Sequence, residues 1–172
     1  MEPTLVNGDR FVVDKAVYGI VLPSMSEAIE HWADPAPGDV VVLCSPAGDV
    51  DVIKRVIGVA GDRVEIVDGE VFVNGESIRR RILGPCADDE GGDPTDCELA
   101  EEGIGAATWR VSYSLLSPTE SYAAREVPPG HVFVRGDHRD HSNDSRNPRV
   151  GFVPVTRLRG RGGDQGRTNR SP

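Results

Sequence analysis

One strand-like stretch contains a lysine in an apolar setting. The chain has 172 residues and only two lysines, Lys15 and Lys54, and Lys54 lies within the apolar run 50–59. Alternation of side chains along a strand puts Lys54 on one face with Val52 and Val56. Burial among apolar neighbours favours the neutral amine, and a neutral amine can act as a general base. The pattern therefore indicates a lysine base, and the alternative is a lysine whose amine reaches solvent past the strand edge.

A second stretch, residues 136–147, contains Asp, His, Arg, Ser and Asn side chains in close succession. Carboxylates and guanidinium groups at this density can pair with one another and fix the shape of a loop. The segment lacks the glycine and the later glutamate of a calcium loop, and its two histidines have no second ligand pair at zinc spacing. We therefore expect a structural polar loop and predict neither a metal nor another cofactor.

Short Val-rich and Ile-rich runs must position these residues. The sequence Asp68-Gly69 separates two alternating runs, and Asn74-Gly75 follows the second, as expected for tight hairpin turns. These signals predict an antiparallel meander over about 50–80, in which Arg55 pairs with Asp51. Helical signal is limited to a capping pattern at residue 24 and an apolar spacing through Trp32. The predicted fold class is mainly β, with antiparallel sheets, long loops and little helix.

The net charge of −9 is concentrated in one segment. Eight of the 28 acidic residues lie between Gly84 and Gly105, where no basic residue occurs. We interpret this segment as an irregular, solvated acidic insertion over about 84–106. Its two cysteines, Cys86 and Cys97, could form a disulfide or remain free thiols. The acidic balance argues against nucleic-acid binding.

The length fits one domain, and two features mark its limits. Residues 160–172 contain Gly, Arg, Asn and Ser without apolar partners, and we expect a disordered tail there. No apolar run approaches the roughly 18 residues that a membrane-spanning helix needs. The chain as written therefore contains no predicted transmembrane segment.

Five stretches, in order, resemble the bacterial type I signal peptidases, a family of membrane-anchored serine proteases with a Ser/Lys dyad. The two longest are Lys54-Arg55-Val56-Ile57-Gly58 and the segment Gly136-Asp137-His138-Arg139-Asp140-His141-Ser142-Asn143-Asp144-Ser145-Arg146. The shorter ones are Met1-Glu2-Pro3-Thr4-Leu5, Gly8-Asp9 with Tyr18-Gly19, and Gly38-Asp39-Val40-Val41-Val42. The resemblance implies a signal-peptidase fold, β-barrel-like, with a catalytic domain over residues 1–159.

The resemblance also implies roles for individual residues. Lys54 would be the general base, and Ser142 would orient its amine by a hydrogen bond. Asp144 would pair with Arg146 to hold the loop, with Asp137 as a further structural support. The apolar side chains expected to line the substrate pockets are Met1, Leu5, Val52 and Ile53. His138 and His141 stand where many members have Asn, which adds a potential pH sensitivity.

The family's nucleophile is the serine directly before the Met of its first motif, which is residue 1 here. We therefore expect a start placed too late, a full-length protein with an N-terminal membrane anchor, and a chain inactive as written. The expected substrates are signal peptides of exported preproteins, cleaved on the extracytoplasmic side of the plasma membrane. The alternatives are a non-catalytic module that binds signal peptides and a self-cleaving regulator of the repressor type.

Overall fold

The computed structural model describes residues 1–5, 8–21, 25, 27–86, 96–118 and 120–163. Its strands form four antiparallel sheets, and the described part of the chain contains a single 3-10 turn, η2 (Val155–Arg157), and no α-helix. The mainly β fold class is confirmed, although the sheets remain open and no barrel closes. In that described part, no helix has the length and apolar character needed to cross a membrane.

The largest sheet has six strands and holds the lysine. Its order is β1 (Val13–Asp14), β15 (Leu158–Gly162), β4 (Val40–Cys44), β5 (Asp51–Val59), β13 (His131–Arg135) and β14 (Val153–Pro154). The central strand β5 pairs with β4 on one side and with β13 on the other. Apolar residues of β4, β5 and β13 pack into one core cluster on one face of this sheet, and Val41 and Val56 within it are fully buried.

A four-stranded sheet carries the predicted tight turns. Its order is β12 (Tyr122–Glu126), β6 (Arg63–Val67), β7 (Glu70–Val73) and β8 (Glu76–Ser77). Asp68 and Gly69 between β6 and β7 both have positive φ, 48° and 82°, as the two-residue turn requires. The meander is thus present over 63–77. The prediction was wrong in starting it near residue 50, because β5 gains its partners from distant strands and belongs to the larger sheet.

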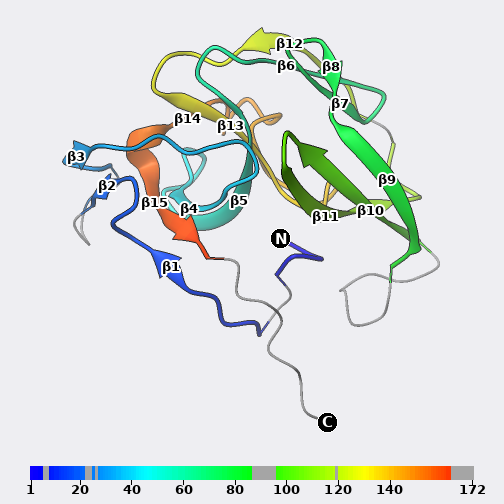
Figure 1. The fold of residues 1–172 in the computed structure, drawn as a ribbon, viewed down its shortest axis with the longest axis horizontal. Helices are drawn as coiled ribbons and strands as arrows, with labels where there is room; N and C mark the ends of the chain where they lie inside the picture. Colours follow the sequence, from blue (N-terminus) through cyan, green and yellow to red (C-terminus); the bar gives the residue numbers. More distant parts are fainter. Residues whose placement is uncertain (6–7, 22–24, 26, 87–95, 119, 164–172) are drawn as a thin grey trace.

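A three-stranded sheet follows, of order β11 (Ala107–Ser114), β10 (Cys97–Ile104) and β9 (Arg79–Pro85). It corrects the prediction of an irregular acidic insertion, because residues 97–104 are a regular strand paired on both sides. A disulfide joins Cys86 to Cys97, with their Cα atoms 5.4 Å apart, and both cysteines pack beside Leu99. Four of the eight acids, at 88, 89, 90 and 93, lie outside the described residues. Figure 1 shows this sheet beside the central strands, with the N-terminal segment between them.

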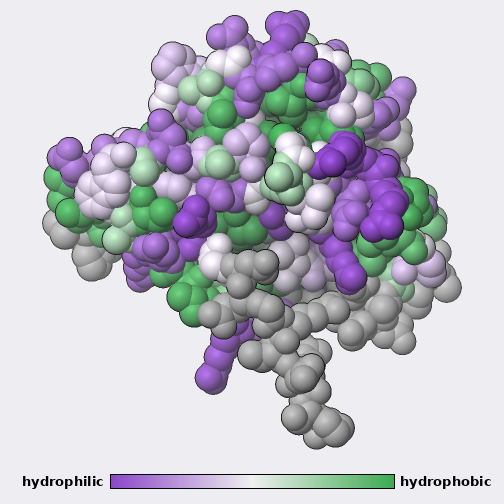
Figure 2. Space-filling model, in the orientation of Figure 1, coloured by the Kyte–Doolittle hydropathy of each residue, from purple (hydrophilic) through white to green (hydrophobic). Residues whose placement is uncertain are grey.

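Two further expectations need correction. The predicted helix near residues 24–32 is replaced, where the chain is described, by the strand pair β2 (Gly19–Ile20) and β3 (Glu30–His31), so its apolar residues do not share a buried helical face. Ile20 and Ile29 instead remain about half exposed, and hydrophobic surface is visible over this pair at the left of Figure 2. The disordered tail expected from residue 160 is wrong for residues 160–162, because they belong to β15, which pairs with β1 and β4. Residues 164–172 lie outside the described residues.

Candidate active site

Lys54 lies in the middle of β5, directly opposite the buried Val41 of β4. Its amine donates a hydrogen bond to Ser142 Oγ over 3.0 Å. Burial lowers the pKa of Lys54, because an ammonium loses hydration there, and the nearby Asp144 carboxylate only partly opposes this effect. The face predicted from strand alternation is therefore the one observed, and the amine is held at a fixed hydroxyl.

The absence of a side chain at Gly136 allows this contact. A Cβ at that position would lie 2.3 Å from Ser142 Oγ and 3.7 Å from Lys54 Nζ. Real Cβ atoms do not approach other heavy atoms at the shorter distance, so any side chain here would displace Ser142. Gly136 was noted only as part of a motif, and the structure gives it a steric role.

Asp144 and Arg146 brace the loop that carries Ser142. Arg146 donates to Asp144 through Nε at 2.8 Å and through Nη2 at 3.0 Å, which is a bidentate ion pair. Arg146 Nη2 also donates to the backbone oxygens of Arg139, at 2.7 Å, and Ser142, at 3.2 Å. Asp144 is fully buried; burial alone would raise its pKa, but the hydrogen bonds and charge of the arginines prevail and lower it. The side chains of Asp144 and Arg146 therefore hold the loop that carries Ser142 in place.

Asp137 is held by Arg55, which corrects the predicted pairing of Arg55 with Asp51. Arg55 donates to the two carboxylate oxygens of Asp137 over 2.9 and 2.7 Å, and both residues are buried. Asp51 instead pairs with Arg159 at the surface, at 3.3 Å. Thr4 hydrogen-bonds to Asp137 and accepts a bond of 3.2 Å from Arg55, so this pair also anchors the N-terminal segment.

The Met1 amine lies in the electrostatic field of Lys54 and Asp137. Burial lowers its pKa, and the charges of Asp137 and Lys54 act on it in opposite directions. Leu5 follows one turn later and donates its backbone N–H to the Met1 oxygen over 3.0 Å. The Met1 amine is therefore near enough to Lys54 for their charges to interact.

The four residues expected to line substrate pockets, Met1, Leu5, Val52 and Ile53, are all half-buried. Val52 packs beside the core cluster of the large sheet, and Ile53 points to the opposite face because adjacent strand residues alternate. The structure therefore does not join Val52 and Ile53 into one pocket wall on a single face of β5.

His138 and His141 contact each other, with His141 Nδ1 2.8 Å from His138 Nε2. Burial, together with the charge of His141, lowers the pKa of His138. His138 Nδ1 is also 3.8 Å from a carboxylate oxygen of Glu2. Among the residues with described positions, no three His, Cys, Asp or Glu side chains are grouped so as to hold a metal ion.

Sequence reasoning missed the buried pair that ties the acidic segment to this loop. Arg139 is fully buried and pairs with Glu102 of β10, which also accepts a hydrogen bond from Tyr113. Backbone hydrogen bonds of 2.9 Å join Ser112 to Asp137 and Arg139. The sequence places Glu102 in an acidic run that we interpreted as solvated. Glu101 and Glu102 belong to the same strand, but adjacent strand residues point to opposite faces, and of these two only Glu102 is buried.

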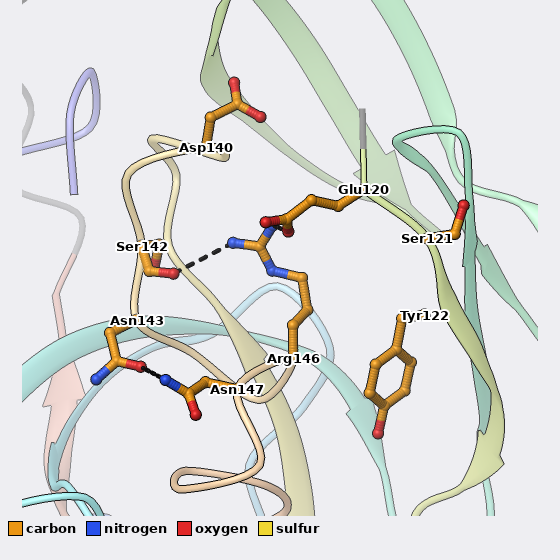
Figure 3. A pocket seen from close by; sticks show the side chains of 8 residues that line it. All are labelled: Glu120, Ser121, Tyr122, Asp140, Ser142, Asn143, Arg146 and Asn147. Atoms are coloured by element: carbon orange, nitrogen blue, oxygen red, sulfur yellow. Dashed lines mark hydrogen bonds and ion pairs between the residues drawn. The ribbon is translucent and has the colours of Figure 1, made fainter. Parts of the chain in front are cut away.

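An open cavity of about 610 Å³ adjoins the loop that carries Ser142. Figure 3 shows Ser142, Asn143, Arg146 and Asn147 on one wall and Glu120, Ser121 and Tyr122 on the other, with Asp140 above. Lys54 is not among the described residues that line it, so this cavity borders the loop rather than the amine.

The chain matches a family model and several known proteins. A family model described as "Signal peptidase, peptidase S26" matches residues 1–163. The chain is 39% identical to a signal peptidase I of Pseudomonas fluorescens over 153 residues, covering 85% of this chain and 51% of that protein. It is 33% identical to a signal peptidase I of Pseudomonas aeruginosa over 175 residues, covering 94% of this chain and 59% of that protein. A crystal structure of a signal peptidase I from Enterococcus faecalis matches with a TM-score of 0.43 at 25% identity, covering 75% of this chain and 97% of that one. The chain thus spans between half and two thirds of the length of these curated relatives.

Proposed function

This chain belongs to the peptidase S26 family of signal peptidases, and we propose that it removes signal peptides from exported preproteins with Lys54 as general base of a Ser/Lys dyad. The observation that carries the proposal is the half-buried Lys54 amine, held 3.0 Å from Ser142 and with a pKa lowered by burial. Arginine could not take this role, because its guanidinium remains protonated.

The reactive serine of the dyad is the residue joined to the Met1 nitrogen. The Met1 amine and Lys54 interact electrostatically, which supports a hydroxyl at this end of the chain as the group that Lys54 deprotonates. In acylation the serine proton passes to the Lys54 amine while the serine oxygen attacks the scissile carbonyl carbon. The protonated amine then gives its proton to the departing peptide nitrogen. In deacylation a water molecule gives a proton to Lys54 and attacks the ester carbonyl carbon. The protonated amine then returns this proton to the serine oxygen as the acyl bond breaks.

Ser142 orients the lysine, and the Asp144–Arg146 and Asp137–Arg55 pairs hold the loop and the strand that carry the two groups. Substrates bind as an extended strand whose small side chains contact Met1, Leu5, Val52 and Ile53. Because Val52 and Ile53 point to opposite faces of β5, they contact different side chains of the substrate. The half-buried side chains of these four residues are compatible with shallow apolar contacts.

The site acts on the extracytoplasmic side of the plasma membrane, to which the full-length protein is attached. Such a location is oxidising, and disulfides persist in oxidising compartments. The disulfide between Cys86 and Cys97 supports this location.

The test uses two forms of the chain that differ in one residue. The serine-extended form carries Gly-Ser joined to Met1, and the alanine-extended form carries Gly-Ala. Cleavage of a signal-peptide substrate is followed by mass spectrometry, which locates the cut bond. We expect specific cleavage by the serine-extended form alone. Cleavage by both forms, or by the chain as printed, would contradict the proposed nucleophile.

Lys54 is tested in the serine-extended form by the variants Lys54→Met and Lys54→Arg. Both should abolish cleavage while leaving the far-ultraviolet circular dichroism spectrum unchanged. Activity that survives Lys54→Met would exclude Lys54 as the base. If the serine-extended form binds the peptide without cutting it, the non-catalytic binding module becomes the better interpretation.

A further inference from the structure

Arg135, at the end of β13, is a buried cation with two nitrogens that have no partner among the described residues. Its side chain belongs to a residue only 3% exposed, and its Nε and Nη1 atoms have no hydrogen-bond partner in the part of the chain that the structure describes. It lies directly opposite Arg55 in the β5–β13 ladder, but Arg55 is neutralised by Asp137. A buried charge without a partner is rare in native proteins and indicates an ion or water that completes the site.

The surrounding charges act on Arg135 in both directions. Burial lowers the pKa of Arg135 most, the charges of Arg139 and Arg146 lower it further, and those of Asp144 and Glu102 raise it. The carboxylates nearest to these arginines are already engaged, since Glu102 pairs with Arg139 and Asp144 with Arg146. Arg139 also has two buried nitrogens, Nε and Nη1, without a partner among the described residues. The cluster therefore has more cationic donors than protein acceptors.

The side chain of Arg135 lines a cavity of about 210 Å³ between the turn at Asp68, the three-stranded sheet and the loop that carries Ser142. A water molecule occupies about 30 Å³ in the liquid, so the cavity can accommodate a small ion with several waters. Arg80 and Arg146 also line it, as do the acids Asp68, Glu98, Glu120 and Asp140. Three of these four acids have partners: Arg80 at 3.3 Å for Glu98, Arg146 for Glu120, and the Ser114 N–H at 2.6 Å for Asp140.

We propose that this cavity is a binding site for a small oxyanion, of the phosphate or carboxylate type, with Arg135 as its principal contact. Arginine matches the oxygens of both groups by hydrogen bonds that carry charge. The acidic side chains that line the cavity repel ligands of high negative charge. We therefore exclude polyphosphates and nucleic acid as ligands of this site. The site is separate from the Lys54 amine and does not depend on the proposed peptidase activity.

The experiment measures thermal unfolding of the chain as printed, at constant ionic strength, while sodium phosphate or sodium acetate replaces sodium chloride. We expect the melting temperature to rise with phosphate or acetate and to reach a plateau, because an anion that binds only the folded state stabilises it. The two series distinguish the two kinds of oxyanion. Pyrophosphate should bind more weakly than phosphate because of the acidic wall.

The decisive variant is Arg135→Met, which removes the buried charge and keeps an apolar side chain of similar length. It should lose the response to either anion, while its stability in chloride should equal or exceed that of the parent because an uncompensated charge has been removed. The matched control is Arg81→Met, which removes the same charge from an exposed arginine paired with Glu101; it should keep the full response.

A direct measurement keeps the test valid if Arg135→Met does not fold. Line broadening of the phosphate signal in ³¹P NMR reports binding to the parent chain, and Arg135→Lys should weaken it. Absence of any anion-specific stabilisation and of any line broadening would overturn the proposal. An equal response in Arg135→Met and the parent would overturn it as well.

Discussion

The amine of Lys54 and the hydroxyl of Ser142 meet at 3.0 Å although 88 residues separate them in the chain. Lys54 belongs to the central strand β5, and Ser142 belongs to a loop whose backbone accepts hydrogen bonds from Arg146. Ser142 Oγ accepts this hydrogen bond and so orients the amine. In the proposed mechanism, this orientation decides whether the amine can take a proton from the serine joined to Met1.

Ser142→Ala in the serine-extended form should therefore reduce kcat about 10-fold to 100-fold with little change in KM, the range expected when a catalytic group is slightly misplaced. Steady-state kinetics on a signal-peptide substrate separate the two constants. Asn143→Ala, which alters the adjacent exposed side chain, is the matched control and should leave kcat nearly unchanged. A selective rise in KM for Ser142→Ala would assign Ser142 to substrate binding instead.

Gly136→Ala should disturb the hydrogen bond between Lys54 and Ser142, because the added methyl group would crowd Ser142. The new Cβ would lie 2.3 Å from Ser142 Oγ, so Ser142 must move away from Lys54. Overpacking of this kind costs about 1–3 kcal/mol of stability, and the displaced hydroxyl should lower kcat as Ser142→Ala does. Gly48→Ala is the control, because a Cβ there meets no atom within 4 Å. Full activity in Gly136→Ala, with an unchanged melting temperature, would show that the loop can shift without consequence.

Lys54→Met should stabilise the chain in a manner that depends on pH. Because burial lowers the pKa of Lys54 in the folded state, the unfolded chain binds more protons between that pKa and the reference value of 10.5. The parent's stability therefore rises with pH across this window. The increase in stability caused by Lys54→Met should be largest at pH values below the pKa of Lys54 in the folded state. It should vanish near the reference pKa of 10.5.

Melting temperatures at several pH values test this sign, and for a chain of this size each kcal/mol corresponds to about 2–4 °C. Lys15→Met removes the same charge from an exposed lysine and controls for the change in net charge. A gain from Lys54→Met that increases with pH would contradict the assigned direction of the pKa.

Local turn chemistry could be predicted from the sequence, and long-range pairing could not. Asp68-Gly69 specifies its hairpin because both residues accept positive φ, which is a property of those residues alone. The partner of Arg55 was predicted wrongly, because Asp51 is near in sequence whereas Asp137 comes from a strand end 82 residues away. Lys54 and its buried face followed from strand alternation, and the contact with Ser142 was expected only from the family resemblance. Nothing in the sequence indicated that Arg135 is buried with two nitrogens that lack a partner in the described part of the chain.

Glu102→Gln should destabilise the chain strongly although Glu102 is one acid among many. Glu102 and Arg139 are both buried, so the amide leaves the Arg139 charge without its carboxylate, at a cost of about 3–5 kcal/mol. Urea unfolding gives the free-energy difference. The neighbouring Glu101→Gln is the control, because Glu101 pairs with Arg81 at the surface, at 3.0 Å, and such pairs contribute about 0–1 kcal/mol.

Arg139 precedes Ser142 by three residues, so Glu102→Gln should also lower kcat in the serine-extended form. Equal effects of the two variants on stability would mean that β10 does not hold the loop that carries Ser142.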